Sequence, residues 1–174
     1  MILSKSKIIS ELNQSIFITP FNWDNLNSNS YDLTLSEKLK VYRTDTLDMA
    51  TSHEMDEIVI HEKGLVLQPG QLYLASTVER TMTNKYIPTI EGRSSTARLG
   101  LFVHISAGLG EAGFDGHWTL ELTCVKPLRI YPHIRICQIC FHEISGDVDL
   151  CQSTKYQNST EAMPSKMCDE LRGR

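Results

Sequence analysis

Short segments in which apolar and polar residues alternate dominate the chain from residue 31 to residue 142. Clusters of Asn, Ser, Gly and Pro, which favour turns, separate them. The alternation is clear over residues 31–35, 39–42, 58–60, 72–77 and 117–125. Because a period of two places one side of each segment in a core, the pattern predicts a mainly β protein, folded as a barrel, sandwich or jelly roll.

Helical patterns are rare in this chain. Residues 3–13 carry apolar side chains at helical spacing, with Ser4 or Ser6 as the N-cap. A second, short helix is expected after Gly92, capped by Ser94 or Ser95 and ended by Gly100. Further expected features are a strand, a Pro-Gly turn and a strand over 65–77, a strand over 101–106, a glycine-rich loop over 108–116 and a strand over 134–144.

The length of 174 residues predicts a single domain spanning residues 1–174. From about residue 146 the pattern weakens into a polar tail, which we expect to be disordered or ordered only over a ligand. The 17 Lys and Arg against 21 Asp and Glu give a net charge of −4, which argues against a nucleic-acid polymer or an anionic membrane as partner. Without a secretion signal or a long apolar run, and with five cysteines, the chain is expected to be cytoplasmic with reduced thiols.

Arg93, Ser94, Ser95 and Arg98 form the first candidate site. On one helical turn Ser94 and Arg98 share a face, and two hydroxyls with two guanidinium groups suit a phosphate. A capped helix with solvated charges explains the same spacing, so the residues alone leave both readings open.

Glu121 is the second candidate. Strand alternation places it on one face with Thr119 and Thr123, opposite Trp118, Leu120 and Leu122. Facing solvent the carboxylate would be inert, whereas facing a pocket it could transfer protons.

The CxxC of Cys137 and Cys140 suggests a zinc or redox site only weakly. In a strand these residues point to opposite faces, and no second CxxC or HxxxH pair completes four ligands. We therefore predict small core residues and no zinc. His104, in an apolar strand, is expected to be a hydrogen-bonded core residue.

The order of these pieces resembles the dCTP deaminase family of the dUTPase-like superfamily. The central matches are EGRSSTARLGLFVH at 91–104 and AGFDGHWTLEL at 112–122, with Arg98 and Glu121 separated by 23 positions. Flanking matches are NSYDLTL at 29–35, QPGQLYLAST at 68–77, RICQICF at 135–141 and the tail KYQNSTEAMPSKM at 155–167.

The resemblance implies a distorted β-barrel or jelly roll with a short N-terminal helix, assembled as a homotrimer with active sites between subunits. It also implies that the tail closes over the nucleotide. The implied reaction turns dCTP into dUTP and ammonia, within pyrimidine deoxynucleotide synthesis. dTTP is a candidate inhibitor, because it inhibits many relatives.

The resemblance also assigns roles. Ser94 and the carbonyl group of Ala107 would position the attacking water, Glu121 would move its proton, and Arg98 would orient Ser94 and Glu121. The triphosphate, with Mg²⁺ bridging its oxygens, would meet a polar set consisting of Arg93, Ser95, Arg98, Gln138, Lys155 and Tyr156.

Two departures from the family pattern matter. Ser159 stands where family tails commonly carry a second glutamine. Glu111 stands where relatives that also cleave the triphosphate, giving dUMP and pyrophosphate, have an aspartate. The longer side chain favours deamination alone, but the bifunctional enzyme stays open. A plain dUTPase is disfavoured by Glu121, and a non-enzymatic nucleotide-binding regulator predicts loss of Ser94, Arg98 and Glu121, which are all present.

Overall fold

The computed structural model describes residues 1–103, 106–153 and 155–173. Within them the chain is built mainly of strands, which are β1 (Ile16–Thr19), β2 (Tyr31–Tyr42), β3 (Met55–Val59), β4 (Leu65–Leu67), β5 (Tyr73–Thr83), β6 (Ile87–Gly92), β7 (Leu101–Val103), β8 (Asp115–Cys124), β9 (Leu128–Ile130) and β10 (Arg135–His142). The described helices are short: α1 (Lys5–Glu11), the 3-10 turn η1 (Trp23–Asn25), α2 (Ser94–Ala97) and α3 (Met167–Arg172).

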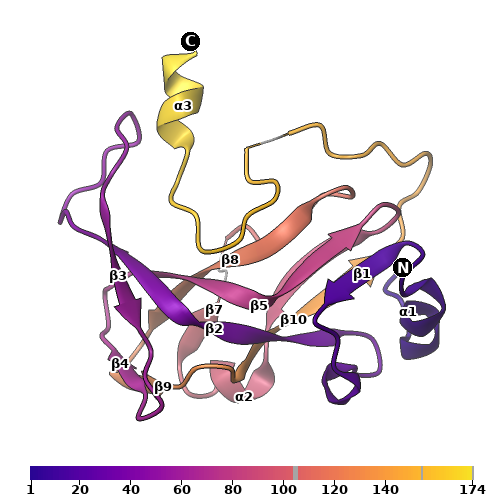
Figure 1. Ribbon diagram of the computed structural model, residues 1–174, viewed down its shortest axis with the longest axis horizontal. Helices are drawn as coiled ribbons and strands as arrows, with labels where there is room; N and C mark the ends of the chain where they lie inside the picture. Colours follow the sequence, from indigo (N-terminus) through magenta and orange to yellow (C-terminus); the bar gives the residue numbers. More distant parts are fainter. Residues whose placement is uncertain (104–105, 154, 174) are drawn as a thin grey trace.

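The strands curl into a nearly closed antiparallel barrel (Figure 1). The main sheet runs β6-β10-β2-β5-β8-β7, with β1 added to β5 and β3 added to β2. The loop after β7 closes the gap to β6, because the amide of Ile90 donates to Gly108 O at 2.7 Å and the amide of Gly110 donates to Pro88 O at 2.8 Å. The mainly β prediction is confirmed.

Alternation within the strands builds the core. In β8 every second residue from Gly116 to Cys124 is buried, and the residues between them are half-buried. The expected segments 31–35 and 39–42 form one continuous strand, β2, whose register with β5 shifts between Leu35 and Leu39. Such a bulge bends a strand, and this one helps to curve the sheet into a barrel.

Both short helices were expected, but one cap was not. Ser4 caps α1, and its hydroxyl oxygen accepts from the amide of Lys7, as predicted. For α2 the prediction of Ser94 or Ser95 as N-cap is wrong. The N-cap is Arg93, whose backbone is extended and whose side chain makes no capping bond, so both serines lie inside the helix. Gly100 follows with φ of +78°, a conformation that glycine adopts readily, and ends the turn.

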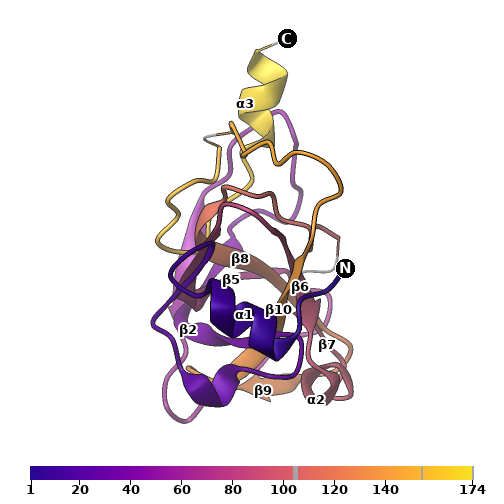
Figure 2. The ribbon, with the colours of Figure 1, turned by 90° about the vertical axis from the view of Figure 1, so that its right-hand side faces the viewer.

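The tail is placed against the barrel, and whether a ligand is required to order it stays a prediction. Residues 147–153 and 155–166 run across one end of the barrel, and α3 follows and projects outward (Figures 1 and 2). Hydrogen bonds join the tail to the chain's own barrel. No helix in the described ranges is long and apolar enough to cross a membrane.

Candidate active site

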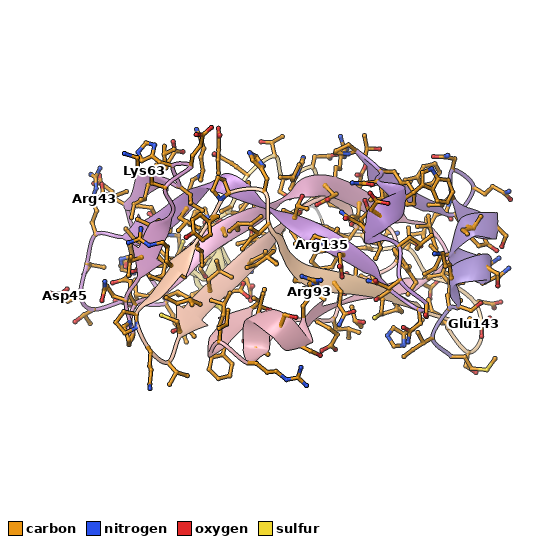
Figure 3. The ribbon with its side chains drawn as sticks, turned by 90° about the horizontal axis from the view of Figure 1, so that it is seen from below. Arg43, Asp45, Lys63, Arg93, Arg135 and Glu143 are labelled. Atoms are coloured by element: carbon orange, nitrogen blue, oxygen red, sulfur yellow. The ribbon has the colours of Figure 1, made fainter. Side chains whose placement is uncertain are left out.

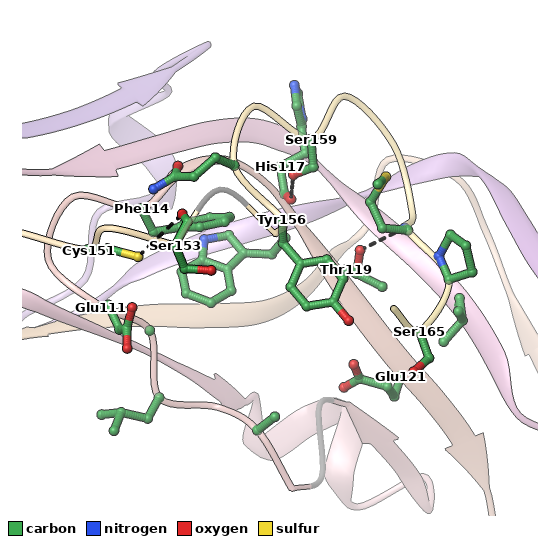
Figure 4. A pocket seen from close by; sticks show the side chains of 18 of the residues that line it. Glu111, Phe114, His117, Thr119, Glu121, Cys151, Ser153, Tyr156, Ser159 and Ser165 are labelled. Atoms are coloured by element: carbon green, nitrogen blue, oxygen red, sulfur yellow. Dashed lines mark hydrogen bonds between the residues drawn. The ribbon is translucent and has the colours of Figure 1, made fainter. Parts of the chain in front are cut away.

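A cavity of about 500 Å³ lies between the outer face of β8 and the tail. Its walls come from the ends of β2 and β5, the loop at 107–114, β8 and the tail between Cys151 and Ser165 (Figure 4). This volume falls in the range of small-molecule sites. The lining combines apolar side chains, among them Leu72, Leu109 and Trp118, with polar ones such as Glu111 and Glu121.

Glu121 lines this cavity together with Thr119. The alternation predicted for β8 is confirmed, because Leu120 and Leu122 are fully buried while Thr119 and Glu121 share the half-buried outer face. Of the two readings of Glu121, the structure therefore selects the pocket. The carboxylate is held on a central strand, between β5 and β7, which is a rigid support for a reacting group.

Ala107 and Glu111 reach the same cavity from the glycine-rich loop. The loop packs closely at Gly110, where a Cβ would lie 2.4 Å from the Trp118 ring and 2.9 Å from Pro88 Cγ. Any side chain there would push the loop away from β6 and β8. In Figure 4 Glu111 and Glu121 are seen at opposite ends of the pocket, with Tyr156 between them.

The tail forms the roof of the cavity through hydrogen bonds to the barrel. The amide of Met163 donates to Thr119 Oγ1 at 2.9 Å, and the amide of Ser165 donates to Tyr42 Oη at 3.2 Å. Ser159, the departure from the family pattern, is buried, and its hydroxyl donates to His117 O at 2.6 Å. In this arrangement Ser159 fixes the tail to β8.

Cys151 joins the tail to the glycine-rich loop. Its amide donates to Ala112 O at 2.6 Å, and the nearby Glu111 carboxylate raises the pKa of the Cys151 thiol. Glu111 is therefore held next to the tail as well as the cavity.

Ser94, Ser95 and Arg98 do not line this cavity. Their side chains are exposed on and beside α2, which lies at the end of the barrel opposite α3 (Figures 1 and 2). In a single chain, therefore, the residues predicted to position water are divided: Ala107 is in the cavity with Glu121, and Ser94 is outside it.

The predicted triphosphate set is also divided. Arg93 and Gln138 meet where β6 pairs with β10: Gln138 Nε2 donates to Gly92 O at 3.1 Å, and Arg93 forms an ion pair with Asp32 at 3.1 Å. Lys155 and Tyr156 lie in the tail, where the Lys155 ammonium pairs with Glu170 and lies 5.2 Å from the Tyr156 ring centroid. Within one chain the predicted triphosphate residues therefore lie in two separate places, as active sites between subunits would require.

The cysteine pair lies in a strand, as expected. Cys137 is fully buried and Cys140 is half-buried on the other face of β10. Burial raises the pKa of both thiols, which lowers their reactivity. Within residues 1–103, 106–153 and 155–173, no three His, Cys, Asp or Glu side chains are grouped to hold a metal. His104 lies outside the described residues.

Several pocket residues escaped the sequence analysis. Tyr42, Phe114 and the segment 163–165 enter the cavity only because the barrel closes and the tail folds back. Asp32 and Arg135, which surround Arg93, were also missed. The sequence signal that could have identified Asp32 is a carboxylate inside an alternating segment. In the structure Asp32 is 2% exposed.

The fold is that of the dUTPase-like barrels. A solved dCTP deaminase from Agrobacterium tumefaciens superimposes with a TM-score of 0.65 at 20% identity, covering 82% of this chain. This chain spans about half of that longer one, 48%. The dUTPase of EIAV superimposes with a TM-score of 0.51 at 11% identity, covering 81% of this chain and 97% of the dUTPase.

The chain belongs to the dCTP deaminase-like family, whose sequence model matches residues 2–144. A relative from Clostridium botulinum, named "dCTP deaminase, dUMP-forming", is 53% identical over 167 residues, covering 96% of each protein. A relative from Rhodopirellula baltica, named "dCTP deaminase", is 52% identical over 171 residues, covering 98% of this chain and 86% of the relative.

Proposed function

We propose that the protein catalyses the hydrolytic deamination of dCTP to dUTP and ammonia. The observation that carries the proposal is the position of Glu121, whose side chain lines a cavity of about 500 Å³ on a strand face that also presents His117 and Thr119 there. Membership of the family and the names of its close relatives support this substrate.

The chemistry needs one group that both accepts and donates protons. Glu121 would take a proton from a water held by Ser94 and the carbonyl of Ala107, as the oxygen adds to C4 of the cytosine ring. It would pass this proton to N3, then take the proton of the new C4 hydroxyl and give it to the amino group, so that the C4–N bond breaks, C4 becomes a carbonyl and ammonia departs. A positioned carboxylate supplies general base and general acid catalysis in turn.

We further propose that each active site is completed by a second copy of the chain, in a homotrimer. Glu121 lines the cavity of one chain, while Ser94 and Arg98 are exposed elsewhere. The surface beside α2 also carries exposed apolar side chains, Leu99, Phe102 and Val125, which suit burial against another copy.

Mixing two inactive variants tests this composite site. Glu121→Gln and Arg98→Ala would each be inactive alone. If one subunit supplies Glu121 and its neighbour supplies Arg98, equal mixing with subunit exchange restores about a quarter of the activity, because that fraction of sites receives both intact residues. No recovery in demonstrably mixed trimers would contradict the composite site.

The triphosphate would meet Arg93, Ser95 and Gln138 on one side and Lys155 with Tyr156 on the other. Mg²⁺ would enter with the nucleotide, because the described residues offer no acidic cluster of their own to hold it. When bound, the ion neutralises phosphate charge.

Separation of the products decides the reaction. Purified protein with dCTP and Mg²⁺ is expected to release ammonia and form a uracil nucleotide. Unchanged dCTP, with binding retained, would indicate a nucleotide-binding regulator and overturn the proposal.

A second candidate is the bifunctional enzyme, which also hydrolyses dUTP to dUMP and pyrophosphate. Two observations favour it: Glu111 places a carboxylate in the same cavity as Glu121, and several close relatives are named "dUMP-forming". The extra methylene of Glu111 compared with aspartate argues for the single activity. Accumulating dUTP supports deamination alone, whereas dUMP with pyrophosphate supports both steps.

A further inference from the structure

Two arginines, Arg93 and Arg135, surround one buried carboxylate at the start of β10. Arg93 Nη2 lies 3.1 Å and Arg135 Nη1 lies 3.7 Å from Asp32 Oδ2. The Asp32 side chain is 3% exposed, and Asn27 Nδ2 donates to its other oxygen at 3.0 Å. A buried carboxylate with these partners fixes the arginines around it.

The cluster carries surplus positive charge toward the surface. One carboxylate faces two guanidinium groups, and Arg93 Nη1 donates further to the backbone oxygen of Arg135 at 2.8 Å. The Arg135 side chain is 47% exposed, and its Nη1 also donates to Asp24 O at 3.4 Å, while Arg93 is 25% exposed. Both arginines are seen close together in Figure 3, beside α2.

Gln138 adds a neutral polar group to the same place. Its amide is held at both ends, since Nε2 donates to Gly92 O at 3.1 Å and Oε1 accepts from Ser30 Oγ at 2.8 Å. Arg93 and Gln138 are already members of the proposed triphosphate set. Arg135 lies beside Arg93, but the proposed triphosphate set does not include it.

We propose that Arg135 is a further phosphate-binding residue, held beside Arg93 by the buried Asp32 so that both guanidinium groups face one polyphosphate. The inference rests on the proposed function for the identity of the nucleotide. It adds a residue to which the resemblance assigns no role. A guanidinium that is oriented before binding loses less conformational freedom when it meets phosphate oxygens, which is the physical gain of this arrangement.

Titration of the full-length protein with inorganic tripolyphosphate in the presence of Mg²⁺ tests the site without relying on turnover. The variants are Arg135→Gln, Arg135→Lys and the matched control Arg129→Gln. Arg129 is an exposed arginine on β9 with a single backbone partner, Lys63 O at 3.1 Å.

Arg135→Gln is expected to weaken tripolyphosphate binding by about tenfold, as for the loss of one charged hydrogen-bonding partner. It should raise KM for dCTP by a similar factor with kcat unchanged. Arg135→Lys should recover part of the affinity, and Arg129→Gln should match the wild type. A purely structural role for Arg135 would not be rescued by lysine in this way.

Wild-type affinity in Arg135→Gln, or no tripolyphosphate binding by the wild-type protein, would overturn the inference. The proposed function and this inference can fail separately. If the wild-type protein does not deaminate dCTP but Arg135→Gln still binds tripolyphosphate more weakly than wild type, the phosphate site is supported and the proposed reaction is wrong. If deamination proceeds and Arg135→Gln leaves both measurements unchanged, only the inference is wrong.

Discussion

Gly116 controls how closely the tail approaches β8. A Cβ at this position would lie 2.6 Å from Ser159 Oγ and 3.1 Å from Ser159 N. The hydroxyl can rotate away, but the backbone nitrogen cannot move without shifting the tail. Gly116→Ala is therefore expected to undock this segment while leaving the barrel intact.

The magnitude follows from the bonds at Ser159. The amide of His117 donates to Ser159 O at 3.0 Å, and Ser159 Oγ donates to His117 O at 2.6 Å. Two hydrogen bonds at about 0.5–1.5 kcal/mol each give about 1–3 kcal/mol in favour of docking. Their loss shifts the docking equilibrium by about 5- to 150-fold.

Hydrogen exchange measures that shift directly. The amides of His117 and of Asn158, which donates to Asp115 O at 2.7 Å, should lose protection in Gly116→Ala, while the buried amide of Leu120 should not. If the tail closes over the nucleotide, KM for dCTP should rise as well. Ser159→Ala, which removes one of the two bonds, should give a smaller effect.

Gly173→Ala is the matched control, because a Cβ there has only ordinary contacts at 3.7 Å or more. Unchanged exchange at His117 and Asn158 in Gly116→Ala would refute the close packing on which the magnitude depends.

Three other expectations concern catalysis, pH and metal. Glu121→Gln should lower the rate of ammonia release by about 100-fold or more, the usual contribution of a general acid-base group, while nucleotide binding measured by calorimetry is largely kept. The hydrogen bond from Lys7 lowers the pKa of Glu11 to about 2 from 4.5. Between about pH 2 and pH 4.5, the Glu11 carboxylate is protonated in the unfolded state but still ionised in the folded state. The ionised carboxylate therefore stabilises the folded state by at most about 3 kcal/mol above pH 4.5, and this stabilisation is lost as the pH falls toward 2. Urea unfolding at pH 5 and pH 3 should thus show a smaller pH dependence in Glu11→Gln than in wild type, and equal dependence would contradict it. Activity should survive a zinc-selective chelator when Mg²⁺ is supplied, whereas removing Mg²⁺ should raise KM for dCTP; loss of activity with the zinc chelator alone would make the cysteine pair a zinc candidate again.

The parts of the fold that the sequence predicts are those set by local alternation. The β8 pattern follows from period-two burial, so Glu121 and Thr119 were assigned to one face correctly. The cap of α2 was assigned wrongly because Arg93, Ser94 and Ser95 are adjacent, and only the backbone angles decide which of them starts the helix. The path of the tail could not be predicted because it depends on partners distant in the sequence, such as Tyr42 and Thr119.

The site itself is less local than its motifs suggest. Arg98 and Glu121 are 23 positions apart in the sequence, yet only Glu121 lines the cavity of one chain. The spacing between two residues does not record whether they act within one chain or across a junction of two. The surroundings of Arg93 also come from distant parts of the sequence. Asp32 lies in β2 and Arg135 lies in β10, and no periodicity of the sequence links them to Arg93. For this barrel, the motif therefore names the side chains that we propose to react, whereas the closure of the sheet decides which other groups lie around them.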